Sequence, residues 1–251
     1  PEGDLIQSYD SKIRIWKRAY RTKGLANRNV IPQPAIRGIS QRTGTNVIDL
    51  DFEIVDPDDA KLGFVLGPVA RVRLDRTRQI KDDVVKQLGK LDTAVELGAQ
   101  AGIQYSGIIT PYDTLSATVD VVWDVAGAHK GRVITPSVSF LTPVSRGAAV
   151  VLSVSADHVD DNFAEYYYSI GPSGSLASGL PTYNARGGFQ SVGANALITY
   201  DLDGDLTNGG FALFGLAGYS RMLGNFADSP IVADRSSPDQ FLGGIGIGYT
   251  F

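Results

Sequence analysis

FLGGIGIGYTF, residues 241–251, ends the 251-residue chain and carries its clearest fold signal. Large apolar side chains occupy five odd positions, whereas the even positions hold glycines, one leucine and one threonine. Successive side chains of a β-strand point to opposite faces, so one face of this strand is apolar and the other is nearly bare. A transmembrane β-barrel places apolar residues toward lipid and small or polar residues toward its lumen. The stretch therefore predicts a transmembrane strand rather than a strand of a soluble β-sandwich.

The end of this strand has a second property. A terminal aromatic residue after alternating apolar positions resembles the assembly signal of bacterial outer-membrane barrels. The resemblance implies that Tyr249 and Phe251 form a C-terminal signal read by the barrel-assembly machinery.

Composition agrees with a barrel. The chain is 43% hydrophobic, yet it has no run of about 18 apolar residues that could form a transmembrane helix. A barrel needs none, because only half of its strand residues face lipid. The absence of cysteine excludes disulfides and thiolate metal sites, and no cofactor is indicated. No signal peptide is visible before Pro1, and we expect that one has been removed.

Charge separates the N-terminus from the rest. Residues 1–30 hold seven basic and three acidic residues, a net +4, whereas the remainder holds 16 and 24, a net −8. We therefore divide the chain into a basic segment of undetermined structure, residues 1–29, and a barrel domain, residues 30–251. The basic segment alone could suggest nucleic acid, but the acidity of the rest of the chain argues against such a partner.

The same period-two alternation recurs along residues 30–251. Together with the last strand it predicts ten antiparallel strands, or twelve if residues 1–29 add a hairpin. The other predicted strands cover residues 30–39, 46–56, 61–74, 92–106, 113–124, 131–142, 147–158, 189–202 and 209–221.

The connections between these strands alternate in length. Counted back from Phe251, long connections at 222–239, 158–188, 125–131 and 74–91 alternate with short ones near 202–208, 143–146, 107–112 and 57–60. Outer-membrane barrels have long external loops and short periplasmic turns. The loop 158–188 is long enough to fold over the barrel mouth, and residues 81–90 could form a short helical turn within their loop.

Charged residues fall on the lumen-facing side of several predicted strands. Unpaired buried charge is costly, so these residues should pair with one another. The two readings are a structural plug and an ion-selective constriction; ten strands lie near the size at which side chains fill a barrel, which favours the plug. The predicted lumen network comprises Arg37, Asp49, Asp51, Glu53, Arg71, Arg73 and Glu96.

Other candidate residues give weaker signals. A catalytic reading would need a nucleophile beside His129 or His158, and no nucleophile motif is present, so no catalytic residue is predicted. The acidic residues Asp157, Asp160 and Asp161 could bind a divalent cation, but they match no calcium loop and read better as a solvated loop. The run 166–168, three tyrosines, is typical of an interfacial aromatic girdle, with a ligand platform as the alternative.

Three stretches resemble the MipA/OmpV family of Gram-negative outer-membrane proteins: LGKLDTAVELGAQAGIQY at 88–105, YYYSIGPSGSLASGLPTYNARGGFQSVG at 166–193, and YSRMLGNFADSPIVADRSSPDQFLGGIGIGYTF at 219–251. The resemblance covers residues 31–251 and implies an outer-membrane barrel. One member of the family is associated with scaffolding between a lytic transglycosylase and a peptidoglycan synthase, and others are described as adhesins or stress-linked porins.

The resemblance implies a non-enzymatic scaffold or adaptor for peptidoglycan-remodelling envelope proteins in the outer membrane. Expected partners are membrane lipid and lipopolysaccharide, the barrel-assembly machinery, and a peptidoglycan hydrolase, synthase or other envelope protein. The alternatives are a small porin or ligand-binding channel, suggested by the polar lumen, and a surface adhesin acting through the external loops.

Overall fold

The structure is a computed structural model, and it describes residues 33–42, 45–54, 61–77, 80–206 and 208–250. Side chains are described from residue 61 to residue 249 within these ranges, so only the backbone of the first two strands enters the account. The basic segment 1–29, and with it the alternative of twelve strands, lies outside the described residues.

The described residues form one antiparallel sheet in which every strand pairs with the next along the chain. The ten strands are β1 (Gln33–Arg42), β2 (Thr45–Ile54), β3 (Leu62–Arg73), β4 (Ala94–Ser106), β5 (Thr114–Asp124), β6 (Arg132–Ser145), β7 (Ala148–Val159), β8 (Gly188–Asp201), β9 (Gly210–Met222) and β10 (Asp239–Thr250). The predicted all-β, antiparallel class is confirmed.

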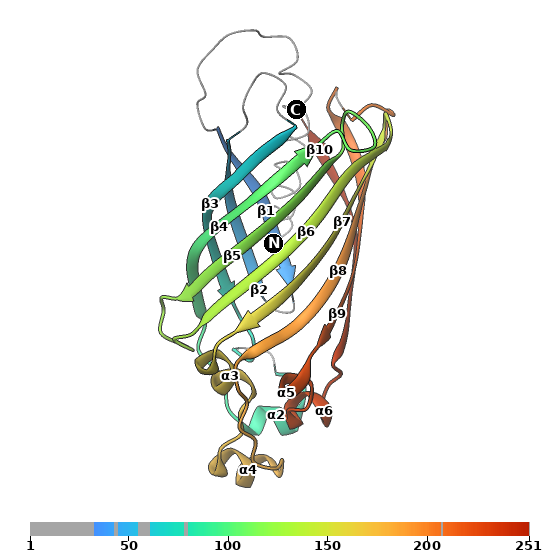
Figure 1. The fold of residues 1–251 in the computed structure, drawn as a ribbon. Coiled ribbons are helices and arrows are strands. Elements are labelled where there is room, and N and C mark those ends of the chain that lie inside the picture. Colours follow the sequence, from blue (N-terminus) through green and yellow to red (C-terminus); the bar gives the residue numbers. More distant parts are fainter. Residues whose placement is uncertain (1–32, 43–44, 55–60, 78–79, 207, 251) are drawn as a thin grey trace.

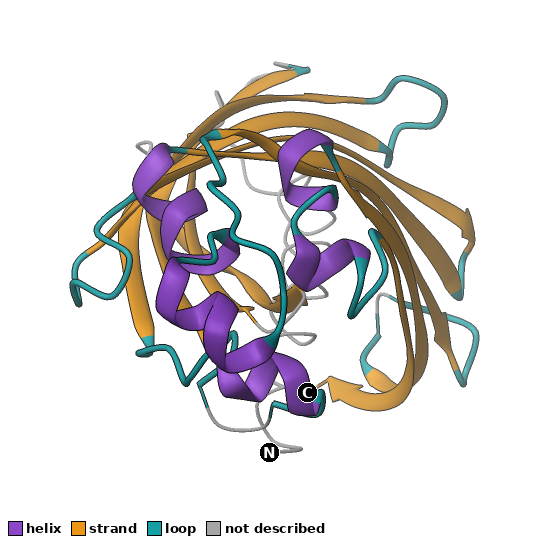
Figure 2. Ribbon diagram, turned by 90° about the horizontal axis from the view of Figure 1, so that it is seen from below, coloured by secondary structure: helices purple, strands orange, loops and turns teal. Residues whose placement is uncertain are grey.

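The sheet is long, strongly twisted and curled around a central axis (Figures 1 and 2). Its concave face surrounds the axis, and its convex face points outward. Among the described residues, the two end strands pair only with their sequence neighbours, β1 with β2 and β10 with β9.

The two faces differ in the way that the alternation predicts. On β3, Leu62, Phe64 and Leu66 are about half exposed on the convex face, whereas Val65, Arg71 and other odd positions are buried on the concave face. The last strand is still more one-sided, since Ile245 is 95% exposed. An apolar face this exposed and this continuous is unusual for a protein surrounded only by water.

Two glycines allow the sheet to twist tightly between β4 and β5. A Cβ at Gly98 would collide with the carbonyl oxygen of Val121, and one at Gly102 would collide with that of Ala117. Glycine is therefore required at both positions by close approach of the neighbouring backbone.

In the described part of the chain, five short helices lie together at one end of the sheet, in three of the long connections (Figure 1). They are α2 (Asp83–Gln87), α3 (Asp161–Tyr168), α4 (Pro172–Ser178), α5 (Gly224–Ala227) and α6 (Pro230–Ala233). We call these helices and the connections that hold them, residues 74–93, 160–187 and 223–238, the cap. None of the described helices has the length and hydropathy needed to cross a bilayer.

The predicted alternation of connections is only partly right. The helix predicted within 81–90 is present as α2, and the loop after β7 forms α3, which packs at the end of the sheet, and α4, which lies farther out (Figure 1). Residues 125–131, however, make a connection no longer than the turn 107–113 at the opposite end. The main apolar core lies where the cap meets the sheet.

Candidate functional site

The cap is held together by contacts between connections far apart in sequence. Arg235 donates from Nη2 to Asp82 Oδ2 at 2.7 Å, which joins the connection after β9 to the one after β3. The Tyr183 hydroxyl donates to the carbonyl oxygen of Asn225 at 2.6 Å, and Ser229 donates to the carbonyl oxygen of Tyr168 at 2.8 Å. These contacts make the three connections one structure.

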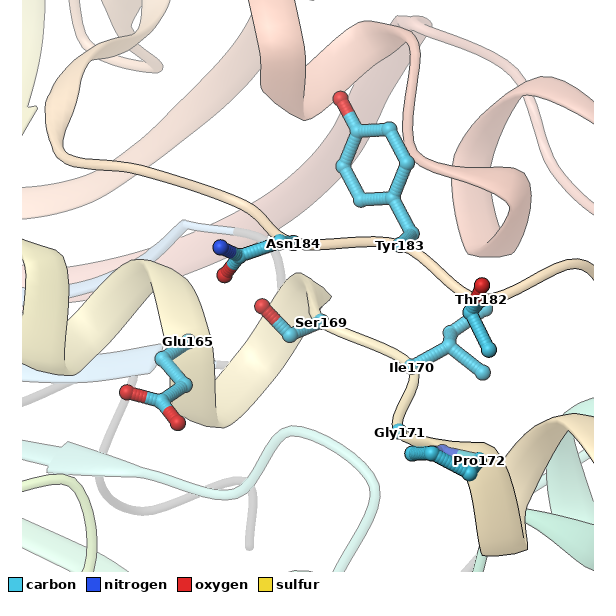
Figure 3. Close-up of a pocket in the computed structure, with 8 residues that line it drawn as sticks. All are labelled: Glu165, Ser169, Ile170, Gly171, Pro172, Thr182, Tyr183 and Asn184. Carbon is cyan, nitrogen blue, oxygen red and sulfur yellow. The ribbon is translucent and has the colours of Figure 1, made fainter.

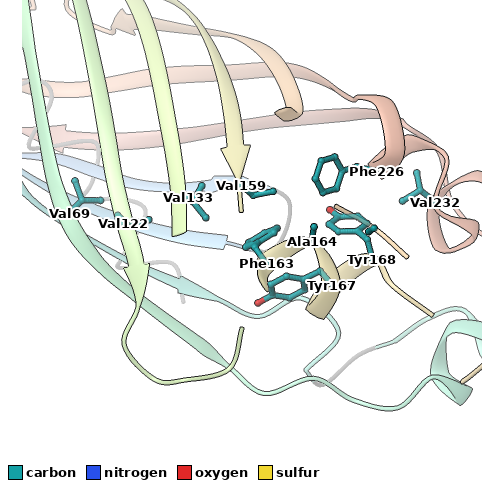
Figure 4. Close-up of a cluster of buried hydrophobic side chains, with 11 residues drawn as sticks. Val69, Val122, Val133, Val159, Phe163, Ala164, Tyr167, Tyr168, Phe226 and Val232 are labelled. Carbon is teal, nitrogen blue, oxygen red and sulfur yellow. The ribbon is translucent and has the colours of Figure 1, made fainter. Parts of the chain in front are cut away.

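Helix α3 anchors the cap to the concave face (Figure 4). Asp160 caps its N-terminus by accepting from the backbone N–H of Phe163 at 3.1 Å. The helix then buries Phe163, Ala164 and two tyrosines against valines of the sheet. The buried cluster comprises Val69, Val122, Val133, Val159, Phe163, Ala164, Tyr167, Tyr168, Ala185, Phe226 and Val232.

The prediction of an interfacial girdle for the tyrosine run is wrong. Tyr167 and Tyr168 are 5% and 8% exposed, because the helical period turns both rings into the core. Gln190 Nε2 donates to the Tyr168 hydroxyl at 2.5 Å. Burial raises the pKa of Tyr168 to about 12, so this residue is neutral at physiological pH. Tyr166 instead accepts from the backbone N–H of Asp92 at 2.8 Å.

A buried charged group lies directly beneath α3. Arg73 donates from Nε to Glu96 Oε1 at 3.0 Å, and Glu96 is fully buried. His129 Nε2 lies 3.0 Å from the same oxygen. Because the N–H of Gly131 donates to His129 Nδ1, the proton of a neutral imidazole belongs on Nε2, which then donates to Glu96.

Aromatic rings of α3 cover this charged group. The Arg73 guanidinium carbon lies 4.9 Å from the centre of the Phe163 ring and 5.9 Å from that of Tyr167. The His129 ring meets Phe163 edge-on at 5.0 Å. Cation–π attraction is strongest where the cation is shielded from water, as it is here. The charges therefore fasten the cap as well as occupying the concave face.

A second group of polar side chains runs across the concave face from β3 to β8. Arg71 donates to Asp120 at 2.6 Å and to the Thr135 hydroxyl at 3.1 Å. Gln100 also donates to Asp120, at 2.7 Å. The Thr135 hydroxyl donates in turn to the Asp157 carboxylate at 2.7 Å. The chain of bonds links strands that are not neighbours.

The structure brings together three members of the predicted lumen network: Arg71, Arg73 and Glu96 are all buried on the concave face. The side chains of the other four, Arg37, Asp49, Asp51 and Glu53, lie outside the described residues. In the backbone register, Val47 rather than Asp49 is opposite Arg71, and Asp49 is opposite Val69.

Asp120, Thr135, Gln100 and His129 join these groups although the sequence analysis did not assign them there. Three of them could have been found by parity, because they fall on the same side of their strands as the concave-face charges. His129 gave no such signal, since it lies in a connection.

The other acidic and histidine residues singled out in the sequence make local contacts in the structure. Asp160 and Asp161 accept backbone N–H groups of Arg132 and Gly187, while Asp157 faces Thr135. His158 packs edge-on against Phe189 at 5.1 Å. Within the described part of the chain, no group of three or more histidines and acids is placed to hold a metal ion.

A shallow depression opens on the outer side of the cap between α3 and α4 (Figure 3). Its volume is about 520 Å³, and its lining is of mixed polar and apolar character. Tyr183 turns its ring toward Asn225 and away from the depression. The lining residues are Glu165, Ser169, Ile170, Gly171, Pro172, Thr182, Tyr183 and Asn184.

At the end of the last strand, Tyr249 lies on the convex face and packs on Phe211 with ring centres 4.8 Å apart. Phe251, the other member of the predicted assembly signal, lies outside the described residues.

No curated protein matches the chain. Residues 16–251 match a family described as MltA-interacting protein MipA, and the match therefore begins within the basic N-terminal segment. It covers all ten strands and the cap, and it agrees with the resemblance seen in the three sequence stretches. The chain belongs to the MltA-interacting protein MipA family.

Proposed function

We propose that the chain is a non-enzymatic outer-membrane β-barrel, closed between β1 and β10, that serves as a scaffold for a peptidoglycan-acting envelope protein of the MltA type. The family description supplies the class of partner. The exposed apolar convex face supports insertion in a bilayer, where side chains such as Phe64 and Ile245 meet lipid. The C-terminal aromatic signal, Tyr249 and Phe251, belongs to the same proposal.

One observation favours a scaffold over a channel. The cap packs a buried aromatic core against one end of the concave face, and Phe163 and Tyr167 lie directly over the Arg73–Glu96 pair. A pathway for ions would have to pass this core and the charges below it. In this proposal the lumen network is structural, and the ends of the barrel carry the interactions.

A small porin is the second candidate, and a specific observation favours it. Beyond the cap, the concave face is lined by small hydroxyl side chains such as Thr118 and Ser137, whose oxygens lie 2.8 Å apart. Polar linings of this kind occur in water-filled barrels. Opening of the cap would then convert the closed barrel into a channel.

Two measurements on the full chain separate these functions. The first is the conductance of the purified protein in planar bilayers, where a scaffold is silent and a porin gives steady currents. The second is photo-crosslinking in intact envelopes, followed by mass spectrometry, from Asn208 in a short turn and from Leu176 at the tip of α4. Both positions are exposed.

We expect crosslinks from Asn208 to a peptidoglycan hydrolase or synthase, because short turns face the periplasm in outer-membrane barrels. Leu176 serves as the matched position at the other end. Crosslinks to external proteins from Leu176 alone would instead favour the adhesin, and steady conductance would favour the porin.

A further inference from the structure

The turn between β4 and β5, residues 107–113, differs from the other turns described at its end of the sheet. Its tip is apolar, with Ile108 46% and Ile109 77% exposed and Pro111 exposed beside them. The neighbouring turns are charged, since Arg146 and Asp205 form an exposed ion pair at 2.8 Å. An exposed group of branched apolar side chains at the tip of a turn is typical of a site that contacts a protein or a membrane.

The backbone N–H groups of this turn are paired inside the turn. The carboxylate of Asp113 accepts from the N–H groups of Ile108 at 2.6 Å, Ile109 at 2.8 Å and Thr110 at 2.6 Å. The N–H of Gly107 donates to the Asp113 carbonyl oxygen, and that of Tyr112 to the Thr110 hydroxyl. Proline at 111 has no N–H, so every backbone N–H from Gly107 to Tyr112 has a partner inside the turn.

The single charge of the turn is also hidden. Asp113 is fully buried, so its carboxylate lies inside the turn while the apolar side chains lie outside. Polar backbone groups enter an apolar medium only when they are paired internally. The N–H groups of this turn meet that condition although the tip of the turn is exposed.

The apolar tip is continuous with the convex face. Tyr105 precedes the turn on β4 and Leu115 follows it on β5, and both are exposed on that face. We infer that the 107–113 turn is a membrane anchor, with Ile108 and Ile109 immersed at the boundary between lipid headgroups and acyl chains. The inference rests on the proposed membrane barrel and adds the position of one turn relative to the bilayer.

The test uses the full chain, which has no cysteine of its own, so a single introduced thiol can be labelled selectively. Ile109→Cys reports on the tip, Asn208→Cys on another short turn, and Val119→Cys on the convex face of β5. Each variant carries an environment-sensitive fluorophore and is folded into phosphatidylcholine vesicles. Nitroxide-labelled lipids quench fluorophores in the membrane, and iodide quenches those in water.

We expect the label at 109 to be quenched by nitroxide lipid at least about twofold more than the label at 208, as for a group buried about 5–10 Å into the interface. Iodide should give the opposite order. A label at 109 that is open to iodide while the label at 119 is in lipid would overturn the anchor and leave the barrel intact. Lack of lipid quenching at 119 would overturn the barrel itself.

A protein partner is the competing occupant of the tip. Photo-crosslinking from position 109 in intact envelopes would then capture a protein, while the vesicle label at 109 stayed open to iodide. That result also overturns the anchor. Capture of lipid alone, together with quenching by nitroxide lipid, supports it.

Discussion

Individual side chains beneath the cap are held by several partners at once, and one of the charge pairs joins strands that are not adjacent. Arg71 on β3 reaches Asp120 on β5, across β4. On the concave face of β4, Gly98 lies between Glu96 and Gln100, so no side chain stands in the way. The Arg71–Asp120 pair therefore depends on glycine at position 98.

Removal of one charge of this pair should cost more than removal of both. Arg71→Ala leaves Asp120 buried without its cation, and we expect a loss of about 3–5 kcal/mol. Because the two residues are in direct contact, Arg71→Ala/Asp120→Ala should cost less than the sum of the single changes. Denaturant unfolding of the four proteins in one detergent measures the coupling, and strict additivity would contradict a direct pair.

Asp113 gives a prediction with a defined pH dependence. Burial alone would raise the pKa of its carboxyl, but the N–H groups of Thr110, Ile108 and Ile109 outweigh burial and lower that pKa below its usual value. The stabilisation is therefore complete above the usual aspartate pKa of about 3.9 and is lost as the pH falls through the lower, folded value.

Asp113→Asn should remove charge-assisted bonds that contribute about 1–3 kcal/mol to the turn. Hydrogen exchange at Ile108, Ile109 and Thr110 provides the measurement. We expect faster exchange in the variant at neutral pH, and a difference between variant and parent that shrinks in acid. A difference that grew in acid would have the wrong sign.

The sequence predicted which residues share a face but not which of them touch. Parity placed Arg71, Arg73 and Glu96 on one side of their strands, because a strand fixes side-chain direction. The partners of Arg71 depend on the strand register and on the length of its side chain, which extends across β4. Neither property produces a local pattern in the sequence. His129 reaches Glu96 from a connection, where no period applies.

At the scale of whole elements, the strands were predictable and the connections were not. The alternation along β3, β4 and β5 was correct because a sheet with two different environments imposes it. The tyrosines of α3 were misassigned because eight residues of helix within a long loop give too short a pattern for its period to be recognised.

Opposite faces of one strand should tolerate charge differently. Val154 is 53% exposed on the convex face at the centre of β7, and its neighbour Ser153 is half-buried on the concave face. Val154→Arg should cost about 2–4 kcal/mol near the bilayer midplane, and Ser153→Arg less. Equal losses in a vesicle folding assay would argue against lipid on the convex face.

The last strand should matter more for assembly than for stability. Deletion of Phe251 removes the terminal aromatic of the proposed signal. It leaves intact all the described pairs between β9 and β10, the last of which is Thr250 opposite Gly210. We expect reduced outer-membrane levels in cells and a nearly unchanged melting temperature for the protein folded in vitro. Normal levels in cells would remove the basis for the signal.

For the molecule as a whole, the same group of residues is expected to support both the stability of the fold and the proposed closure of the barrel by the cap. The apolar core is not spread along the sheet but concentrated where α3 enters the concave face, directly above the buried charges. Contacts such as Arg235–Asp82 tie the outer parts of the cap together without reaching this core. A change at the centre of the core should therefore affect folding and closure together, whereas a change that keeps its rings should affect neither.

Phe163 and Tyr167 provide that comparison. Phe163 is almost fully buried and covers both Arg73 and His129, so Phe163→Ala should cost about 3–5 kcal/mol and loosen the cap. Tyr167→Phe keeps the ring and removes a buried hydroxyl oxygen that has no hydrogen-bond partner among the described residues, so it should be neutral or slightly stabilising. Thermal melting in detergent tests both expectations.

Planar-bilayer recordings on the same two variants then test closure. If the cap core seals the barrel, Phe163→Ala should show transient openings while Tyr167→Phe stays as silent as the parent protein. Openings in both variants would mean that the seal depends on the Tyr167 hydroxyl as well as on the packed rings. If Phe163→Ala is destabilised but still gives no conductance, the seal lies deeper, at the hydrogen-bonded group of Arg71, Asp120 and Thr135. Those side chains span the concave face without contacts from α3.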